Sequence, residues 1–184
     1  MQTIGPLRQE PLSQLNQSDS RFLAGDRVQL RVTRKGFAPE YVPLTVAEWR
    51  SDKPPMIDAS RLLADPNAAC FLAYAQAQFA GQAIVQRGAH HLAELLDFRV
   101  DSRFRRQGAG SQLVSACADW AQRQGCLGLM VEVSDEQPVA CQFLEHIGFV
   151  LGGVDRLSRS AEPEQRKRLP AMRESVLMFY RFFD

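Results

Sequence analysis

Long hydrophobic runs, cysteine pairs and an excess of charge of either sign are all missing from this chain of 184 residues. No apolar stretch approaches the ~20 residues that cross a membrane as a helix. Basic and acidic side chains nearly balance, at 22 and 21, and the net charge of +1 gives no sign of the basic face that nucleic-acid-binding domains usually carry. Residues 1–6 lack the basic start and apolar core of a signal peptide. We therefore expect no membrane partner and no nucleic-acid partner.

Cysteine is scarce, and its spacing is irregular. The four cysteines (Cys70, Cys117, Cys126 and Cys141) form no Cys-x-x-Cys motif. Two of them fall within helical patterns, where a small apolar residue packs well. Disulfide frameworks and structural metal sites are recognised by closer, repeated spacings. The pattern predicts reduced thiols in the core of a cytoplasmic protein that has no metal site.

The length, with a hydrophobic content of 45%, fits a single globular domain over residues 1–184. Residues 1–20 are polar and rich in Gln and Ser. They are expected to form an extension that is either flexible or docked through a short helix carrying Leu7, Leu12 and Leu15.

Apolar periodicity indicates the secondary structure. It predicts a half-buried strand over 28–32 and short helices over 46–51 and 59–64. From residue 70 onwards it predicts strands over 70–75, 82–87, 94–100, 127–133, 149–154 and 176–182, and helices over 111–124 and 138–147. Gly81 suggests a hairpin turn before the second of these strands. The basic stretch 156–175 is expected to be a solvated loop, with a lid beside the substrate as the alternative. Strands alternating with helices are typical of α/β or α+β layering.

The stretch Arg105-Arg106-Gln107-Gly108-Ala109-Gly110 lies between an apolar run and an amphipathic run. A strand, a glycine-bearing turn and a helix start therefore follow one another. The first turn of a helix leaves backbone N–H groups without partners, and the helix dipole adds positive charge there. Gly108 and Gly110 lack a Cβ, so a ligand can approach the backbone closely, and Arg105 adds a cation suited to phosphate. The pattern predicts a site for a pyrophosphate-bearing cofactor.

The same residues resemble the acyl-CoA loop of the GNAT acetyltransferases. Arg105-x-x-Gly108-x-Gly110 follows a strand ending in Phe98-x-Val100, and the pair Gly148-Phe149 after a short helix matches a second GNAT signal. Residues 128–132, 139–141, 149–155 and 178–180 are similar to stretches of the streptothricin acetyltransferase type. The resemblance covers roughly residues 28–183 and is weaker before residue 70.

The resemblance implies a GNAT-like fold, with a mixed, mostly antiparallel sheet, helices on both faces and a central pair of splayed strands at 95–100 and 127–133. It implies that acetyl-CoA lies in the gap, with its pantetheine arm along the first strand and its pyrophosphate on the amides of 107–111. The residues implied to bind the cofactor are Phe98, Arg99, Val100, Arg105, Arg106, Gln107, Gly108, Ala109, Gly110, Ser111 and Gln137.

The chain departs from the family pattern at three chemical positions. Leu144 stands where the family usually has a tyrosine acid, Leu96 where the streptothricin type has a glutamate, and Gln137 where an asparagine commonly contacts the pantetheine. Three other residues are candidates for the catalytic roles. Glu132 could be a general base or an anchor for a cationic amine, Asp97 could face the acceptor, and Tyr180 could replace the missing phenol.

The resemblance implies an acetyl-CoA-dependent N-acetyltransferase that transfers acetyl directly, in a ternary complex, to a primary amine of a small, cationic molecule. Two alternatives remain open. Leu144 favours a non-catalytic acyl-CoA-binding module, and an acetyltransferase acting on a protein amine would differ only in its acceptor. Pairing of the last strands between subunits would make a homodimer, which the sequence leaves open.

Overall fold

The computed structural model describes residues 2–6, 15, 17–19, 21–51, 59–168 and 173–184. The chain divides into two compact units. The first unit comprises Met1–Arg21, Ser51–Leu129 and Phe182–Asp184, and the second comprises Phe22–Arg50 and Met130–Arg181.

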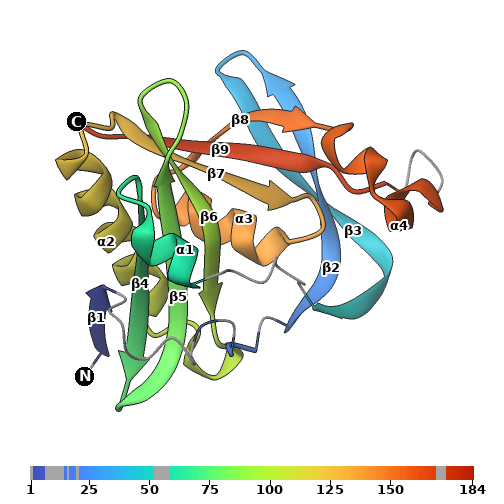
Figure 1. Ribbon diagram of the computed structural model, residues 1–184. Helices are drawn as coiled ribbons and strands as arrows, with labels where there is room; N and C mark the ends of the chain where they lie inside the picture. Colours follow the sequence, from blue (N-terminus) through green and yellow to red (C-terminus); the bar gives the residue numbers. More distant parts are fainter. Residues whose placement is uncertain (1, 7–14, 16, 20, 52–58, 169–172) are drawn as a thin grey trace. The chain divides into compact units, whose positions relative to one another are not determined.

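An antiparallel sheet forms the centre of the first unit (Figure 1). Its strands are β1 (Gln2–Pro6), β4 (Ala68–Ala75), β5 (Gln78–Arg87) and β6 (Leu92–Val100), in the order β1-β4-β5-β6. Each neighbouring pair is antiparallel. The strands predicted from residue 70 to residue 100 are therefore confirmed. Strand β1 lies within the stretch for which an extension was expected, and that expectation is wrong for residues 2–6.

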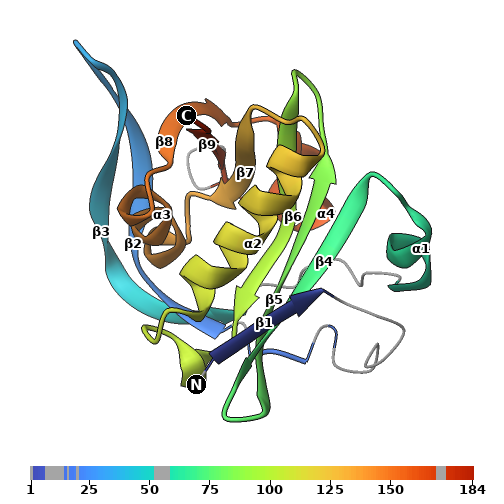
Figure 2. The same cartoon turned by 90° about the vertical axis from the view of Figure 1, so that its left-hand side faces the viewer.

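The two helices of the first unit lie on opposite faces of this sheet (Figures 1 and 2). The helix α2 (Ala109–Arg123) buries an apolar side that includes Leu113, Val114, Cys117, Trp120 and Ala121. On the other face, Leu62 of the short helix α1 (Ala59–Ala64) packs against a cluster of Leu15, Cys70, Leu72 and Ile84. Helices on both faces of a mostly antiparallel sheet confirm the expected α/β class. Leu7 and Leu12, the other two residues of the expected docking helix, lie outside the described residues.

The hairpin between β4 and β5 was predicted correctly, but its turn was not. The turn lies at Gln76 and Ala77, whose φ angles of 51° and 62° are those of a two-residue turn with both central residues left-handed. Gly81 lies inside β5, opposite Val100. A Cβ at Gly81 would collide with the carbonyl oxygen of Arg99, so this glycine allows close approach of two strands instead of a turn.

In the second unit, β2 (Arg21–Thr33) and β3 (Gly36–Ser51) form a two-stranded sheet. Strand β2 extends the predicted strand over 28–32 in both directions. The predicted helix over 46–51 is wrong, because these residues continue β3. Local periodicity over six residues is weak compared with the hydrogen bonds that a long paired strand gains along its whole length.

The second unit also holds strands β7, β9 and β8, in that order. Strand β7 (Gly128–Ser134) starts in the first unit and continues into the second, and β8 (Val150–Asp155) pairs antiparallel with β9 (Val176–Phe182). Helix α3 (Pro138–His146) contacts β8. The predicted strands and helix are confirmed here. The splay expected between 95–100 and 127–133 involves both units and stays a prediction.

The basic stretch 156–175 has structure of its own. It contains the 3₁₀ helix η3 (Ser158–Ala161) and the short helix α4 (Pro163–Arg166). The side chain of Gln165 is buried. Its amide N–H group donates to the Glu174 carboxylate, and its amide oxygen accepts from the backbone N–H group of Glu174, both at 2.9 Å. The expectation of a solvated loop is therefore wrong for the described part of this stretch.

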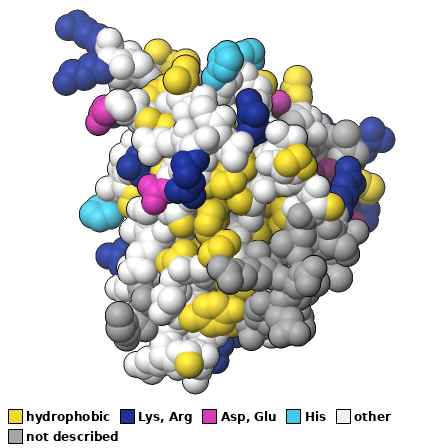
Figure 3. Space-filling view, turned by 60° about the vertical axis from the view of Figure 1, so that its left-hand side comes forward, with side chains coloured by type: hydrophobic (Ala, Val, Ile, Leu, Met, Phe, Trp, Pro, Cys, Tyr) yellow, Lys and Arg dark blue, Asp and Glu magenta, His cyan; other side chains and the backbone are white. Residues whose placement is uncertain are grey.

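All four cysteines are buried and free. Burial raises the pKa of the Cys70 and Cys141 thiols to about 12, so both stay protonated, as expected of core thiols. None of the helices among the described residues has the length and apolar character to cross a bilayer. On the face drawn in Figure 3, lysine and arginine side chains lie scattered and do not form a continuous patch.

Candidate functional site

The loop between β6 and α2 begins with a well-anchored turn. The N–H group of Asp101 donates to the carbonyl oxygen of Ala80 on the neighbouring strand β5, at 2.9 Å. The buried Asp101 carboxylate then caps the 3₁₀ helix η2 (Ser102–Phe104) by accepting from the N–H group of Arg103 at 3.0 Å. This turn fixes where the chain leaves the sheet and enters the glycine-bearing loop.

Two residues of the loop have left-handed backbone conformations. The φ angle is 61° at Arg106 and 90° at Gly108, with Gln107 between them. Left-handed residues next to right-handed ones turn successive N–H groups toward one concavity, an arrangement that binds anions. Arg106, Gln107 and Gly108 are all exposed residues.

Helix α2 starts directly behind this turn, without a side-chain cap. Its first bond of the helical type runs from the N–H group of Gln112 to the carbonyl oxygen of Gly108, at 3.1 Å. In the part of the chain that the structure describes, the N–H groups of Ala109, Gly110 and Ser111 have no hydrogen-bond acceptor. Unpartnered amides at the positive end of a helix dipole are the donor set that a pyrophosphate requires. The structure thus brings together the amides that the sequence singled out.

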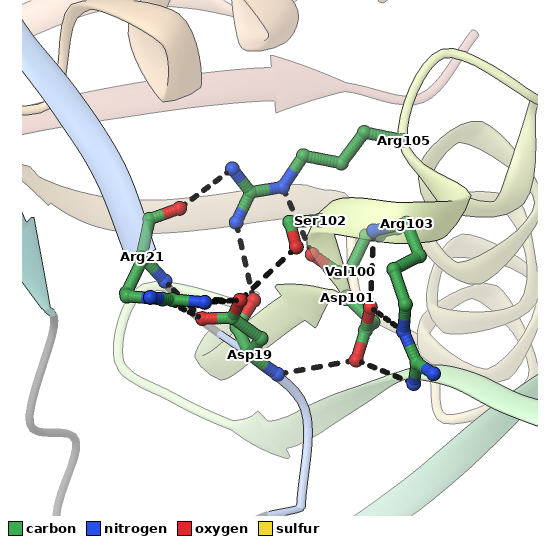
Figure 4. Close-up of polar contacts among 7 residues, drawn as sticks. All are labelled: Asp19, Arg21, Val100, Asp101, Ser102, Arg103 and Arg105. Atoms are coloured by element: carbon green, nitrogen blue, oxygen red, sulfur yellow. Dashed lines mark hydrogen bonds and ion pairs between the residues drawn. The ribbon is translucent and has the colours of Figure 1, made fainter.

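Arg105 has a different surrounding from the one expected for a phosphate ligand (Figure 4). Its Nε donates to the carbonyl oxygen of Val100 at 3.0 Å, and its Nη1 donates to that of Arg21 at 2.8 Å. A longer bond of 3.4 Å joins Nη2 to the carbonyl oxygen of Asp19. The guanidinium therefore bonds to three carbonyl oxygens of the protein itself, one at the end of β6 and two on Asp19 and Arg21.

Strand β6 carries an irregularity close to the loop. The pairing changes from Ile84 opposite Asp97 to Val85 opposite Leu95, which leaves Leu96 as the extra residue of a β-bulge. Leu96 is exposed. Bulges commonly redirect the chain next to functional sites. Phe98 and Val100, the residues expected to flank the pantetheine, follow on the same strand and are half-buried.

Asp97, a predicted catalytic residue, lies in a buried polar cluster. Its carboxylate receives two bonds from the Arg99 guanidinium, at 2.7 and 2.8 Å, and one from the side-chain amide of Gln82. All three side chains are buried, and the strand register places them on the same face as Leu72 and Ile84. A carboxylate that already accepts three bonds is poorly placed to take a proton from a substrate, so the geometry favours a structural role. The side chain of Arg99 is likewise committed to this cluster.

The remaining predicted site residues lie in the second unit. Glu132 is exposed on β7, while its neighbours Val131 and Val133 are buried, as the alternation predicted. Tyr180 on β9 packs its ring over Gly152, and its hydroxyl lies 3.8 Å from the sulfur of Met178. Gln137 is the N-cap residue of α3. Leu144 is a core residue of that helix, 3% exposed, and its aliphatic side chain has no acidic proton to donate.

An arginine cluster that no sequence pattern indicated lies at the end of β7. Glu136, which is buried, forms ion pairs with Arg27 at 3.0 Å, with Arg168 at 2.7 Å and with Arg50. Arg27 also pairs with Asp135 at 3.2 Å, and burial is the main cause of the raised pKa of Asp135. The three arginines come from distant segments, so no local spacing could have revealed the cluster. It ties the basic stretch to β7 and β2.

Comparison with known proteins shows the family of this chain. Residues 34–149 match the acetyltransferase (GNAT) family. A streptothricin acetyltransferase of Escherichia coli is 22% identical over 155 residues, which cover 84% of this chain and 85% of that protein. A streptothricin acetyltransferase A of Bacillus subtilis is 27% identical over 114 residues, 62% of each chain.

Solved structures share the fold. A protein assigned as a streptothricin acetyltransferase from Bacillus anthracis, solved in complex with acetyl coenzyme A, has a TM-score of 0.87 and 23% identity, with 100% of this chain and 99% of that one covered. Nourseothricin acetyltransferase has a TM-score of 0.78 and 19% identity, with 97% and 96% covered. The resemblance to the streptothricin acetyltransferase type is thus confirmed. The chain belongs to the acetyltransferase (GNAT) family, and it is an acyltransferase whose acyl donor is acetyl-CoA.

Proposed function

We propose that this chain transfers an acetyl group from acetyl-CoA directly to a primary amine of a small cationic molecule, with streptothricin as the first candidate. The observation that carries the proposal is the set of amides at residues 109–111, behind a left-handed turn, that have no acceptor among the described residues of this GNAT-family chain. The choice of acceptor rests on the similarity to streptothricin acetyltransferases.

The cofactor assignments follow the backbone of the first unit. The amides of residues 107–111 would hold the pyrophosphate, and the backbone of residues 98–100 would lie along the pantetheine arm, with Gln137 as a further contact. Acetyl-CoA, when bound, supplies an activated acetyl group as a thioester. The protein then has to deliver a neutral amine in the correct orientation, because oriented reactants gain a large effective concentration.

The acceptor side requires proton transfer. An amine that is protonated in water must lose a proton before it can attack. Glu132 is proposed for this step, either as the base or as the anchor that holds the cationic amine, since it is an exposed carboxylate between buried neighbours. Tyr180 is proposed as the proton donor to the leaving thiolate, because this half-buried side chain has a hydroxyl whose contact within the described part of the chain is a weak one to the sulfur of Met178.

Thiol release from acetyl-CoA, measured over a panel of amines, tests the proposed reaction. We expect streptothricin to raise the rate on the order of a hundredfold above the rate without an amine, a typical gain from positioned proton transfer. Mass spectrometry should find one added acetyl group on a primary amine of streptothricin. Neutral amines of similar size serve as the control for the requirement for positive charge.

Other results would point to the alternatives. Tight acetyl-CoA binding without turnover on any amine would contradict the enzyme and support a binding module. Acetylation of an accompanying protein, with no reaction of the small amines, would move the acceptor to a protein amine.

Replacing Glu132 by glutamine tests its role in the acceptor site. If Glu132 is the base, kcat should fall about a hundredfold, the usual contribution of a positioned general base. If it anchors the cation, the KM for the amine should rise about tenfold, the loss of one charged hydrogen bond, while kcat is preserved. Glu40→Gln is the matched control, since Glu40 is an exposed strand glutamate in the same unit. Unchanged kcat and KM in Glu132→Gln would exclude both roles.

A further inference from the structure

A short segment far away in the sequence holds the loop before α2 in place (Figure 4). Asp19 and Arg21 lie beside the loop, and their carbonyl oxygens accept bonds from the guanidinium of Arg105. The same guanidinium donates to Val100, the last residue of β6. Arg105 therefore joins the end of the strand to a segment more than eighty positions earlier.

Asp19 makes the reciprocal contacts. Its N–H group donates to the Asp101 carboxylate at 3.2 Å, and its own carboxylate accepts from the hydroxyl of Ser102 at 3.1 Å. The carboxylate is held in place by the guanidinium of Arg21, with bonds of 2.8 to 3.1 Å. Asp19 thus contacts the cap and the first residue of η2, and its carbonyl oxygen contacts Arg105 as well.

The charges around this contact suit a neighbouring anion. Asp19 and Asp101 are each paired with an arginine, Arg21 and Arg103. Hydrogen bonds from the Arg21 side chain are the main cause of the lowered pKa of Asp19, which keeps this carboxylate ionised throughout the ordinary assay range. Arg105 and Arg106 add further positive charge, so the two carboxylates do not make the loop repel a diphosphate.

We propose that Asp19 is a positioning residue for acetyl-CoA, which together with Arg105 locks residues 100–106 so that the α2 amides are aimed before the cofactor binds. Arg105 then contributes to cofactor binding mainly through its hydrogen bonds to carbonyl oxygens of the protein, and less through its positive charge. A loop that is ordered beforehand binds more tightly, because less conformational entropy is lost on binding. This inference rests on the assignment of residues 107–111 under the proposed function.

The test compares Asp19→Ala with Asp65→Ala. The Asp65 carboxylate also accepts a bond from a backbone N–H group, that of Asn67, at 2.8 Å, and one from the side-chain amide of Gln86 at 3.3 Å. Gln86 lies near the far end of β5 from the loop and pairs with Ala68, so Asp65 does not contact the loop. In Asp19→Ala we expect the Kd for coenzyme A, measured by calorimetry, to rise about tenfold, the effect of one charged hydrogen bond. The KM for acetyl-CoA should rise in parallel, and kcat at saturating acetyl-CoA should stay within about twofold, since the preformed geometry is restored once the cofactor is bound.

Two further measurements separate positioning from general stability. Hydrogen exchange of the amides of 107–111 in the protein without coenzyme A should become faster in Asp19→Ala and stay unchanged in Asp65→Ala. Arg105→Lys keeps the charge but replaces the planar guanidinium fork by a compact ammonium group. It should therefore weaken binding as much as Asp19→Ala, and the double variant should weaken it no further. Thermal unfolding of each variant verifies that the protein is folded.

Specific results would overturn the inference. Wild-type affinity in Asp19→Ala, or an equal loss in Asp65→Ala, would show that the Asp19 carboxylate does not position the loop. Full binding by Arg105→Lys would show that the bonds from the Arg105 guanidinium do not position it either. If Gly108→Pro also retained affinity, the loop assignment itself would be wrong. If Gly108→Pro lost binding and Asp19→Ala did not, only the role of Asp19 would be wrong.

Discussion

Replacing Gly108 by proline should abolish acetyl-CoA binding, with an affinity loss on the order of a thousandfold, the combined effect of two or three lost charged hydrogen bonds. Gly108 has a φ angle of 90°, which proline cannot adopt because its ring holds φ near −65°. Proline also removes the N–H group of residue 108. Both effects would misdirect the start of α2 and the amides of Ala109, Gly110 and Ser111. Isothermal titration of acetyl-CoA into the folded variant measures the loss.

Gly125→Ala is the matched control for this substitution. Gly125 has a φ angle of 75°, follows the other end of α2 and has open space around the position of a Cβ. Alanine there introduces left-handed strain of about 1 kcal/mol without touching the loop. Its affinity for acetyl-CoA should equal that of the wild type. A folded Gly108→Pro protein with unchanged affinity would remove the phosphate-loop assignment.

Removing the carboxylate of Asp97 should destabilise the protein by about 3–5 kcal/mol, the usual cost of leaving one partner of a buried ion pair alone. In Asp97→Ala the guanidinium of Arg99 and the amide of Gln82 would both lose this carboxylate as an acceptor in a buried region. Urea unfolding measures the loss. The double variant Asp97→Leu with Arg99→Met should recover much of it, because no unpaired charge then remains.

This prediction also decides between two roles for Asp97. A structural role requires that stability falls and that the double variant restores it together with acetyl transfer. If Asp97→Ala kept wild-type stability and lost turnover, the carboxylate would be catalytic, and the buried cluster would have to open during the reaction. Gln82→Leu is a useful comparison, since it removes one bond to Asp97 while leaving the ion pair in place.

Local pattern was sufficient for much of the fold. The alternation of Leu129, Val131 and Val133, the helical spacing of Leu113, Cys117 and Trp120, and the strand-turn-helix order around Gly108 all predicted elements that the structure confirms. These signals depend on contacts within a few residues. The same local reasoning was wrong for 46–51, where pairing over a long strand outweighed the helical preference of six residues.

Long-range side-chain partners could not be predicted in this way. Nothing near Arg105 in sequence indicates that its guanidinium meets Asp19 and Arg21, and nothing near Glu136 indicates three arginines from distant segments. The Asp97 cluster requires the register between β5 and β6, which brings Gln82 beside Arg99. Such partners depend on how strands pair and chains cross, and one sequence without its fold does not contain that distance information.

The sequence by itself thus determined the family and the acyl donor and predicted the main-chain loop that would hold it, because a glycine-bearing turn before a helix has a recognisable order of residues. Only the tertiary structure decided what the charged side chains around that loop do. It placed Arg105 against carbonyl oxygens of its own chain and enclosed Asp97 in a buried ion pair. The physical reason is that backbone conformation follows from neighbouring residues, whereas the partner of a charge is set by whichever distant segment folds against it.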